Sequence, residues 1–132
     1  MPPRRLRTPG SRLIAVALAI LAACGAGAAC TSTTPVVVPG GDINRGHQLI
    51  SQYGCGSCHT IPGVKGADGL VGPPLIHWAR RSFIAGSLSN TPANLIIWLE
   101  DPKAVEAVTD MPNLGISEQD ARSIAAYLDS IQ

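Results

Sequence analysis

The sequence predicts an all-α domain of three to five helices joined by long loops rich in glycine and proline. Apolar residues recur at helical spacing in several segments, and those segments begin at good N-capping residues. The 132-residue chain holds 14 glycines and 11 prolines. Many of them gather in residues 61–74 (IPGVKGADGLVGPP), which we therefore expect to be irregular loop. No convincing pair of strands is visible.

The first 23 residues predict an export signal rather than part of this domain. Four arginines without an acid precede an apolar run over residues 13–23, the order found in secretory signals. The run ends in Leu-Ala-Ala-Cys, which resembles a bacterial lipobox and predicts lipidation of Cys24 after cleavage. Two alternatives remain open. Cleavage at residues 26–28 would release a soluble periplasmic protein, and an uncleaved segment of 17 residues to position 29 would be at the short limit for a membrane span.

Residues 24–41 are interpreted as the lipidated N-terminus followed by a flexible linker. Two prolines flank three valines and two glycines follow, so we expect semi-extended rather than packed chain. The valines could instead form a short strand, but no partner is evident. The folded domain is expected to cover residues 42–132.

The helices of this domain are expected in four places. Asp42 caps a helix over residues 42–53 that Gly54 ends, and Gly46 inside it indicates close approach by another helix. Residues 75–82 are expected to form a short helix. Thr91 and Pro92 begin a third helix, which ends before Pro102. Ser117, with Asp120 three residues later, begins the last one.

Residues Cys55-Gly56-Ser57-Cys58-His59 form the C-x-x-C-H pattern of covalent haem attachment. Each thiol can add to one vinyl group of the porphyrin, and the adjacent imidazole can bind the iron from the same side. A zinc site would need about four N or S ligands, usually from two separated pairs. A dithiol redox pair would favour alternating strands and helices. Neither context is visible, so one haem c bound through Cys55 and Cys58 is the favoured interpretation.

Met111 is the candidate for the second axial ligand of the iron. It is the only methionine besides the initiator, and the following proline favours an extended backbone that presents its side chain from a loop. The competing interpretation is a core methionine. His47, expected to be exposed, and His77 are the other candidates. A structural role is the favoured interpretation of His77, and a hydrogen bond to a propionate or a loop carbonyl is the alternative. With both axial positions filled the iron has no open site for substrate, so the sequence predicts a carrier and not an enzyme.

The charge balance excludes a nucleic-acid partner. The chain carries ten Lys+Arg and nine Asp+Glu, and four of the arginines lie in the expected signal, which leaves a formal net charge of −3. Such a domain lacks the basic patch that nucleic acid requires. Electrostatic steering would favour a partner with a basic docking face.

These motifs, in this order, resemble a class I cytochrome c over residues 42–132. The resemblance rests on Gly46, the C-x-x-C-H motif and Gly-Pro-Pro-Leu at 72–75. It continues through Asn94-Leu95-x-x-Trp98-Leu99-x-Asp101-Pro102, Met111-Pro112 and Ile124-Ala-Ala-Tyr-Leu128. More narrowly, the chain is similar to the cytochrome c domain fused to subunit II of caa-type haem–copper oxidases, through Arg80-Arg81, Ala85-Gly86 and Asn90-Thr91-Pro92.

The resemblance implies roles for several residues. The carbonyl of Pro73 would accept a hydrogen bond from His59, and the first and last helices would cross near Gly46 and Tyr127. Arg80 or Arg81 would lie near the haem propionates. Trp98 would either lie there too or simply pack in the core.

The expected function is one-electron transfer by a stand-alone exported protein on the outer face of the cytoplasmic membrane or in the periplasm. The donor would be a quinol-oxidising complex or a dehydrogenase, and the acceptor a terminal haem–copper oxidase. Two alternatives are a fixed subunit of a membrane dehydrogenase or oxidase complex, and a gas or redox sensor from which Met111 dissociates. No small-molecule substrate is expected.

Overall fold

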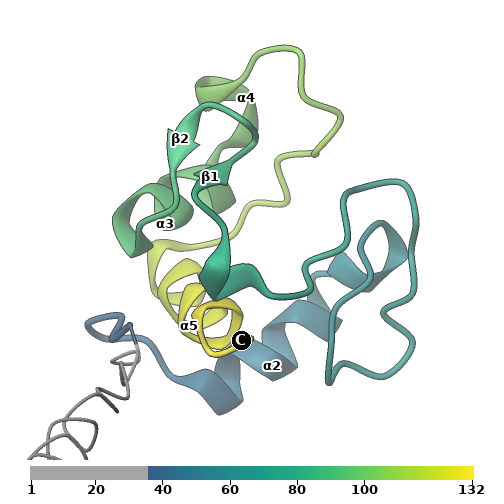
Figure 1. The fold of residues 1–132 in the computed structure, drawn as a ribbon, viewed down its shortest axis with the longest axis vertical. Helices are drawn as coiled ribbons and strands as arrows, with labels where there is room; N and C mark the ends of the chain where they lie inside the picture. The colour runs from purple at the N-terminus through teal and green to yellow at the C-terminus, as the bar shows by residue number, and fades with distance from the viewer. Residues whose placement is uncertain (1–35) are drawn as a thin grey trace, which may run out of the picture. The chain divides into compact units, whose positions relative to one another are not determined.

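The computed structural model describes residues 36–132, which form a helical domain (Figure 1). The longer elements are α2 (Ile43–Gln52), α3 (Pro92–Glu100) and α5 (Glu118–Asp129), with a short α4 (Pro102–Val105). Two 3-10 turns, η1 (Cys55–Ser57) and η2 (Trp78–Arg80), and a hairpin of β1 (Phe83–Ile84) and β2 (Leu88–Ser89) complete the order. The expected all-α class is confirmed, with long loops between the helices.

Helices α2 and α5 cross at Gly46, and this contact organises the core. A Cβ atom at Gly46 would lie 2.0 Å from the carbonyl oxygen of Ser123 and 2.9 Å from Cβ of Tyr127. Only glycine permits this separation of the two backbones. The expected crossing is therefore confirmed, and the apolar faces of both helices are buried by it: Leu49, Ile50, Ala121, Ile124, Ala125 and Leu128.

Three of the expected helix starts are confirmed by side-chain caps. Asp42 accepts a hydrogen bond from the Arg45 backbone N–H at 2.8 Å, and Thr91 and Ser117 cap α3 and α5 in the same way. Gly54 follows α2 with φ +70°, the left-handed conformation expected of a helix stop. Ile43 is half exposed, so it lies outside the buried face of α2.

The expected helix over residues 75–82 is wrong. Only the 3-10 turn Trp78–Arg80 forms there, because His77 has φ +50° and so interrupts a right-handed helix. The sequence showed no pair of strands, whereas the structure contains one short hairpin. Ala85 and Gly86 both take positive φ in the turn between β1 and β2. This turn joins the two short strands, which pair in antiparallel register.

The linker interpretation requires correction for residues 36–41. Val38 is buried, with 5% of its surface exposed, and the Pro39 and Gly40 carbonyls accept hydrogen bonds from Arg122 and Gln119 of α5. A Cβ at Gly41 would lie 2.5 Å from the Arg122 carbonyl oxygen. This end of the expected linker is thus packed on the domain. The expected signal, Cys24 and the start of the linker lie outside the described residues.

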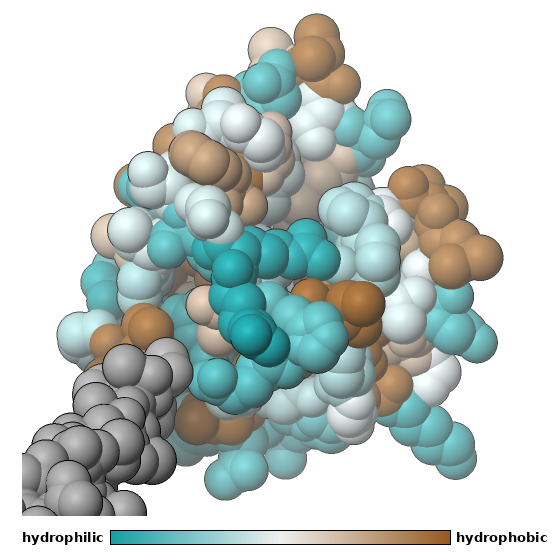
Figure 2. All heavy atoms as spheres, viewed as in Figure 1, coloured by the Kyte–Doolittle hydropathy of each residue, from teal (hydrophilic) through white to brown (hydrophobic). Residues whose placement is uncertain are grey.

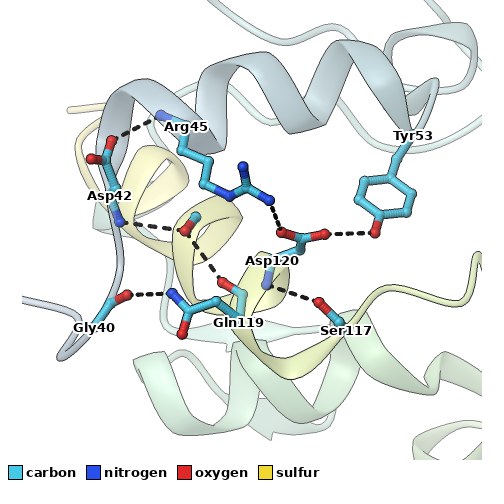
Figure 3. A network of polar contacts seen from close by, with 8 residues as sticks. Gly40, Asp42, Arg45, Tyr53, Ser117, Gln119 and Asp120 are labelled. Carbon is cyan, nitrogen blue, oxygen red and sulfur yellow. Dashed lines mark hydrogen bonds and ion pairs between the residues drawn. The ribbon is translucent and has the colours of Figure 1, made fainter.

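A polar network ties α2 to α5 on the side of the crossing (Figure 3). The Asp120 carboxylate accepts hydrogen bonds from Arg45 at 2.7 Å and from the Tyr53 hydroxyl at 2.9 Å. Asp120 therefore links two helices instead of completing a reciprocal capping box with Ser117. Within residues 36–132, the helices are all too short or too polar to cross a membrane.

Candidate functional site

A cavity of about 390 Å³ opens between the loops and helices, a size within the usual range for cofactor sites. Seven of the candidate site residues predicted from the sequence line it: Cys55, Cys58, His59, Pro73, Arg81, Trp98 and Met111. Arg80, His47 and His77 do not, and Cys24 lies outside the described residues. The cavity thus brings together the attachment motif and Met111, which is 52 positions further along the chain.

The 3-10 turn η1 presents the attachment motif to this cavity. Gly54 starts the turn in the left-handed conformation, and the backbone N–H groups of Cys58 and His59 both donate to the Cys55 carbonyl, at 3.2 and 3.0 Å. Both cysteines are free thiols. This tight turn allows two thiols and an imidazole to line one cavity.

The loop over residues 61–75 folds back on the motif. Gly69 and Gly72 donate backbone hydrogen bonds to the carbonyls of Gly56 and Cys58, at 3.0 and 2.8 Å. A Cβ at Gly69 would lie 2.5 Å from the Ser57 backbone. Gly69 is therefore required by the close approach of two backbone segments. The sequence predicted only an irregular loop here.

The imidazole of His59 is held in one orientation. Its Nδ1 lies 2.7 Å from the Pro73 carbonyl oxygen, the contact that the resemblance implies. A carbonyl oxygen can only accept, so Nδ1 carries the proton and the lone pair of Nε2 is left free for a metal. Gly72 packs against the same ring, since a Cβ there would lie 2.3 Å from Cε1.

The walls of the cavity are mainly apolar. Trp98 is buried, with 8% of its surface exposed, and it lies both in the hydrophobic core and on the cavity wall. Sequence reasoning missed Trp78, which is also buried and lines the cavity, as well as six aliphatic wall residues. These are Ile50, Ile61, Ile84, Leu95, Leu99 and Leu128. The helical spacing of Ile50, Leu95, Leu99 and Leu128 indicated burial but not what they were buried against, and Ile61 and Ile84 lie outside the helices.

Of the two arginines, Arg81 is the one at the cavity. Its guanidinium donates to the Pro74 carbonyl and lies 5.5 Å from the Trp78 ring centroid, within cation–π range. Arg80 is exposed and does not line the cavity. Arg81 is therefore the arginine placed for a contact with a cavity-bound anionic group.

The two other histidines have partners elsewhere. Nε2 of His47 lies 2.9 Å from the Gly63 carbonyl and its ring packs edge-on against Tyr127, so His47 is half-buried rather than exposed as expected. Nδ1 of His77 lies 2.8 Å from the carbonyl oxygen of Gln132. Each carbonyl accepts, so each ring donates, and both histidines serve structural roles.

The zinc and dithiol interpretations find little support at this site. Across residues 36–132, no group of three or more His, Cys, Asp or Glu side chains is placed to hold a metal ion. Burial raises the pKa of the Cys55 thiol, whereas a reactive dithiol needs a lowered pKa.

The residues present fit a covalent haem. A haem of the c type requires a large apolar cavity, two free thiols and an imidazole with Nε2 available, and this site has all three. Gly72 has no side chain, so the ring of His59 can lie directly against its backbone. Fold and site together define a c-type cytochrome.

Comparison with known proteins agrees with the assignment to the c-type cytochromes. The family model for cytochrome c matches residues 43–132. A "Cytochrome c oxidase subunit 2" from Alkalihalophilus pseudofirmus is 33% identical over 90 residues, which cover 67% of this chain and 25% of that protein. The chain thus spans about a quarter of the relative's length. No solved structure shows a significant match.

The chain belongs to the cytochrome c family. Its cofactor is one haem c, bound covalently through Cys55 and Cys58. Its function is electron transfer, as the family implies.

Proposed function

We propose that the protein is an exported one-electron carrier that uses His59 and Met111 as axial ligands and delivers electrons to a terminal haem–copper oxidase. The observation that carries the ligand assignment is that His59 and Met111 line the same cavity, whereas His47 and His77 do not. Met111 is also the only methionine in residues 36–132.

The protein's own residues keep the site ready for electron transfer. When bound, the haem supplies an iron that cycles between ferric and ferrous states. Pro73 orients the His59 imidazole, and such a hydrogen bond makes the ring a better donor. The apolar walls exclude water, and a thioether ligand raises the reduction potential relative to a second imidazole. With both ligands retained, electron transfer requires little rearrangement.

The ligand assignment is tested by the spectrum and potential of the Met111→His variant. Ferric wild-type protein is expected to show the weak near-infrared band of thioether-ligated haem, and the variant is expected to lack it and to have a lower reduction potential. The ferrous wild-type protein should bind carbon monoxide slowly or not at all at neutral pH. Rapid carbon monoxide binding would indicate an open position and would favour the sensor alternative.

The oxidase as acceptor is supported by the name of the relative, a cytochrome c oxidase subunit. The test is oxygen consumption by membranes containing a haem–copper oxidase, measured with and without the purified ferrous protein. Acceleration that saturates with protein concentration is expected. If no oxidase preparation responds, the acceptor assignment is wrong.

The same relative favours a second candidate function, a fixed electron-transfer subunit of an oxidase complex. Such a subunit would purify in detergent together with an oxidase at constant stoichiometry. A free carrier would separate from it. The outcome therefore distinguishes the two without any measurement of rate.

Export and lipidation form the last part of the proposal. The basic stretch, apolar run and Leu-Ala-Ala-Cys24 motif support a lipid anchor at the outer face of the cytoplasmic membrane. Mass spectrometry of the mature N-terminus should show acylated Cys24 as the first residue. An N-terminus at residues 26–29 would indicate a soluble periplasmic protein instead.

A further inference from the structure

Two buried polar atoms in residues 36–132 lack a hydrogen-bond partner, and they lie on side chains that approach each other. They are Nε1 of Trp78 and Oδ2 of Asp129. Only 5% of the Trp78 surface and 6% of the Asp129 surface are exposed. Because nearly all buried polar groups in folded proteins are hydrogen-bonded, a pair of this kind calls for an explanation.

The end of α5 places Asp129 directly behind the wall of the haem cavity. The backbone N–H of Ala79 donates to the Ile131 carbonyl at 3.1 Å, which holds η2 against this end of the helix. Trp78 and Leu128 line the cavity, whereas Asp129 does not. The carboxylate thus lies one side chain away from the space that the haem would fill.

Protons from water can reach this carboxylate. Asp129 is not fully enclosed, and Ser130, which follows it, is exposed. Figure 1 draws the end of α5 toward the viewer, and Figure 2 shows hydrophilic side chains gathered over this part of the domain. A proton can therefore exchange between Asp129 and solvent without an opening of the core.

No charged side chain of the described domain holds Asp129 in one protonation state. Neither ion pair in residues 36–132 includes it. Burial raises its pKa, and only the Trp78 N–H, which favours the ionised form, opposes that rise. The charged and titratable groups of α5 and of the elements packed against it make no contribution: Glu118, Asp120 and Arg122 on α5, Arg45 and His47 on α2, Glu100 on α3, and His77, Arg80 and Arg81 in or beside η2.

We infer that Asp129 takes up a proton from water when the haem iron is reduced and releases it when the iron is oxidised, so that the reduction potential falls as pH rises. This inference rests on the proposed one-electron function and adds its coupling to protons. Ferric haem carries one more positive charge than ferrous haem, and that charge, acting across an apolar wall, stabilises a carboxylate. On reduction the electron goes to the iron, the stabilising charge is lost, and the carboxylate binds a proton.

The coupling is confined to the pH range between two pKa values of Asp129, the lower one in the ferric protein and the higher one in the ferrous protein. Below this range the carboxyl group is protonated in both states, and above it the group is ionised in both. The reduction potential of the haem-loaded protein should therefore fall across this range and level off on either side of it. Spectroelectrochemical titration at a series of pH values measures this profile.

Three variants test the assignment of this profile to Asp129. Asp129→Asn should have a constant potential across the range, close to the acid limit of wild type, because its side chain is neutral throughout. Trp78→Phe should move the range to higher pH, because the indole N–H no longer favours the ionised form. The matched control is Glu118→Gln, which removes an exposed carboxylate of the same helix and should keep the wild-type profile.

Infrared difference spectra of the reduced minus the oxidised protein observe the proton directly. Within the coupling range, reduction should produce the C=O band of a protonated carboxyl group. This band should shift when aspartate is isotope-labelled at its side-chain carboxyl carbon, whereas a band from the haem propionates would not. The labelling needs no variant, so wild-type protein alone can overturn the inference.

The outcomes separate this inference from the proposed function. A pH profile that Asp129→Asn leaves unchanged, or a carboxyl band that does not respond to the label, would assign the proton to the propionates and overturn the inference while leaving electron transfer intact. A wild-type iron that cannot be reduced and reoxidised reversibly would contradict the proposed function itself, and the inference with it.

Discussion

The carbonyl oxygen of Pro73 lies 2.7 Å from Nδ1 of His59, although the two residues are 14 positions apart. The loop between them returns to the attachment motif through backbone hydrogen bonds from Gly69 and Gly72. The orientation of the imidazole is thus set by the folding of a glycine-rich loop and not by the motif itself. This relationship leads to the first prediction.

Gly72→Ala is expected to displace His59 and impair haem ligation. A Cβ at this position would lie 2.3 Å from Cε1 and 2.6 Å from Nδ1 of the ring, so the ring or the loop must move. The haem content per protein, measured as the pyridine haemochrome, should fall, and the loaded fraction should contain more high-spin ferric iron. The control is Gly66→Asn in the same loop, where nothing lies within 4 Å and asparagine tolerates the φ of +74°. Equal haem content and spin state in both variants would contradict the prediction.

Gly46→Ala is expected to destabilise the fold by about 1–3 kcal/mol, the usual cost of overpacking a core contact. The new methyl group would meet the Ser123 carbonyl at 2.0 Å, which forces α2 and α5 apart. Denaturant unfolding of the haem-loaded protein measures the change. Asn44→Ala, at an exposed position of the same helix, should be neutral or slightly stabilising. A Gly46→Ala variant as stable as Asn44→Ala would show that the crossing is looser than described.

Asp120→Asn is expected to lower stability at neutral pH by about 1 kcal/mol, allowing for the solvent exposure of Arg45. Hydrogen bonds from Arg45 and then Tyr53 lower the pKa of Asp120 below its ordinary value of 3.8. The stabilisation is therefore present above the unfolded-state pKa and is lost as pH falls through the lowered folded-state pKa. Unfolding measured against pH should show a shallower acid limb in the variant. Glu118→Gln, which removes only the exposed pair with Arg122, should change stability by less than about 0.5 kcal/mol.

Asp129→Asn is expected to change stability in the direction opposite to Asp120→Asn. Burial raises the pKa of Asp129 above 3.8. The Trp78 indole N–H opposes this rise in part, although its geometry falls short of a hydrogen bond. A raised pKa means that stability is full below the unfolded-state pKa and declines as pH rises through the folded-state pKa.

In the Asp129→Asn variant, stability should therefore not decline in this way as pH rises. The variant should be at least as stable as wild type at neutral pH. Unfolding curves for this variant and Asp120→Asn, collected over the same pH range, provide the comparison. The two identical substitutions should change stability in opposite directions at neutral pH. A loss of stability in both would mean that Asp129 is ionised and stabilising in the folded domain.

The elements that could be predicted from the sequence are those whose signals are local. Asp42, Thr91 and Ser117 cap their helices because a side-chain oxygen needs only the N–H groups two or three residues away. The C-x-x-C-H motif is local for the same reason, since five consecutive residues provide both thiols and the imidazole. The expected helix at residues 75–82 did not form because the backbone at His77 is left-handed and its ring contacts Gln132, 55 positions away.

By itself, the sequence determined the helical class, three of the four helix starts, the covalent haem and the need for close packing at Gly46. Only the tertiary structure decided which arginine reaches the cavity, that Trp78 forms part of its wall, that Val38 is buried, and that Val71 and Val108 line one cavity. The physical reason is range: caps, turns and attachment chemistry act over a few neighbouring residues, whereas a cavity wall is formed by segments that meet only when α2, α3 and α5 pack together.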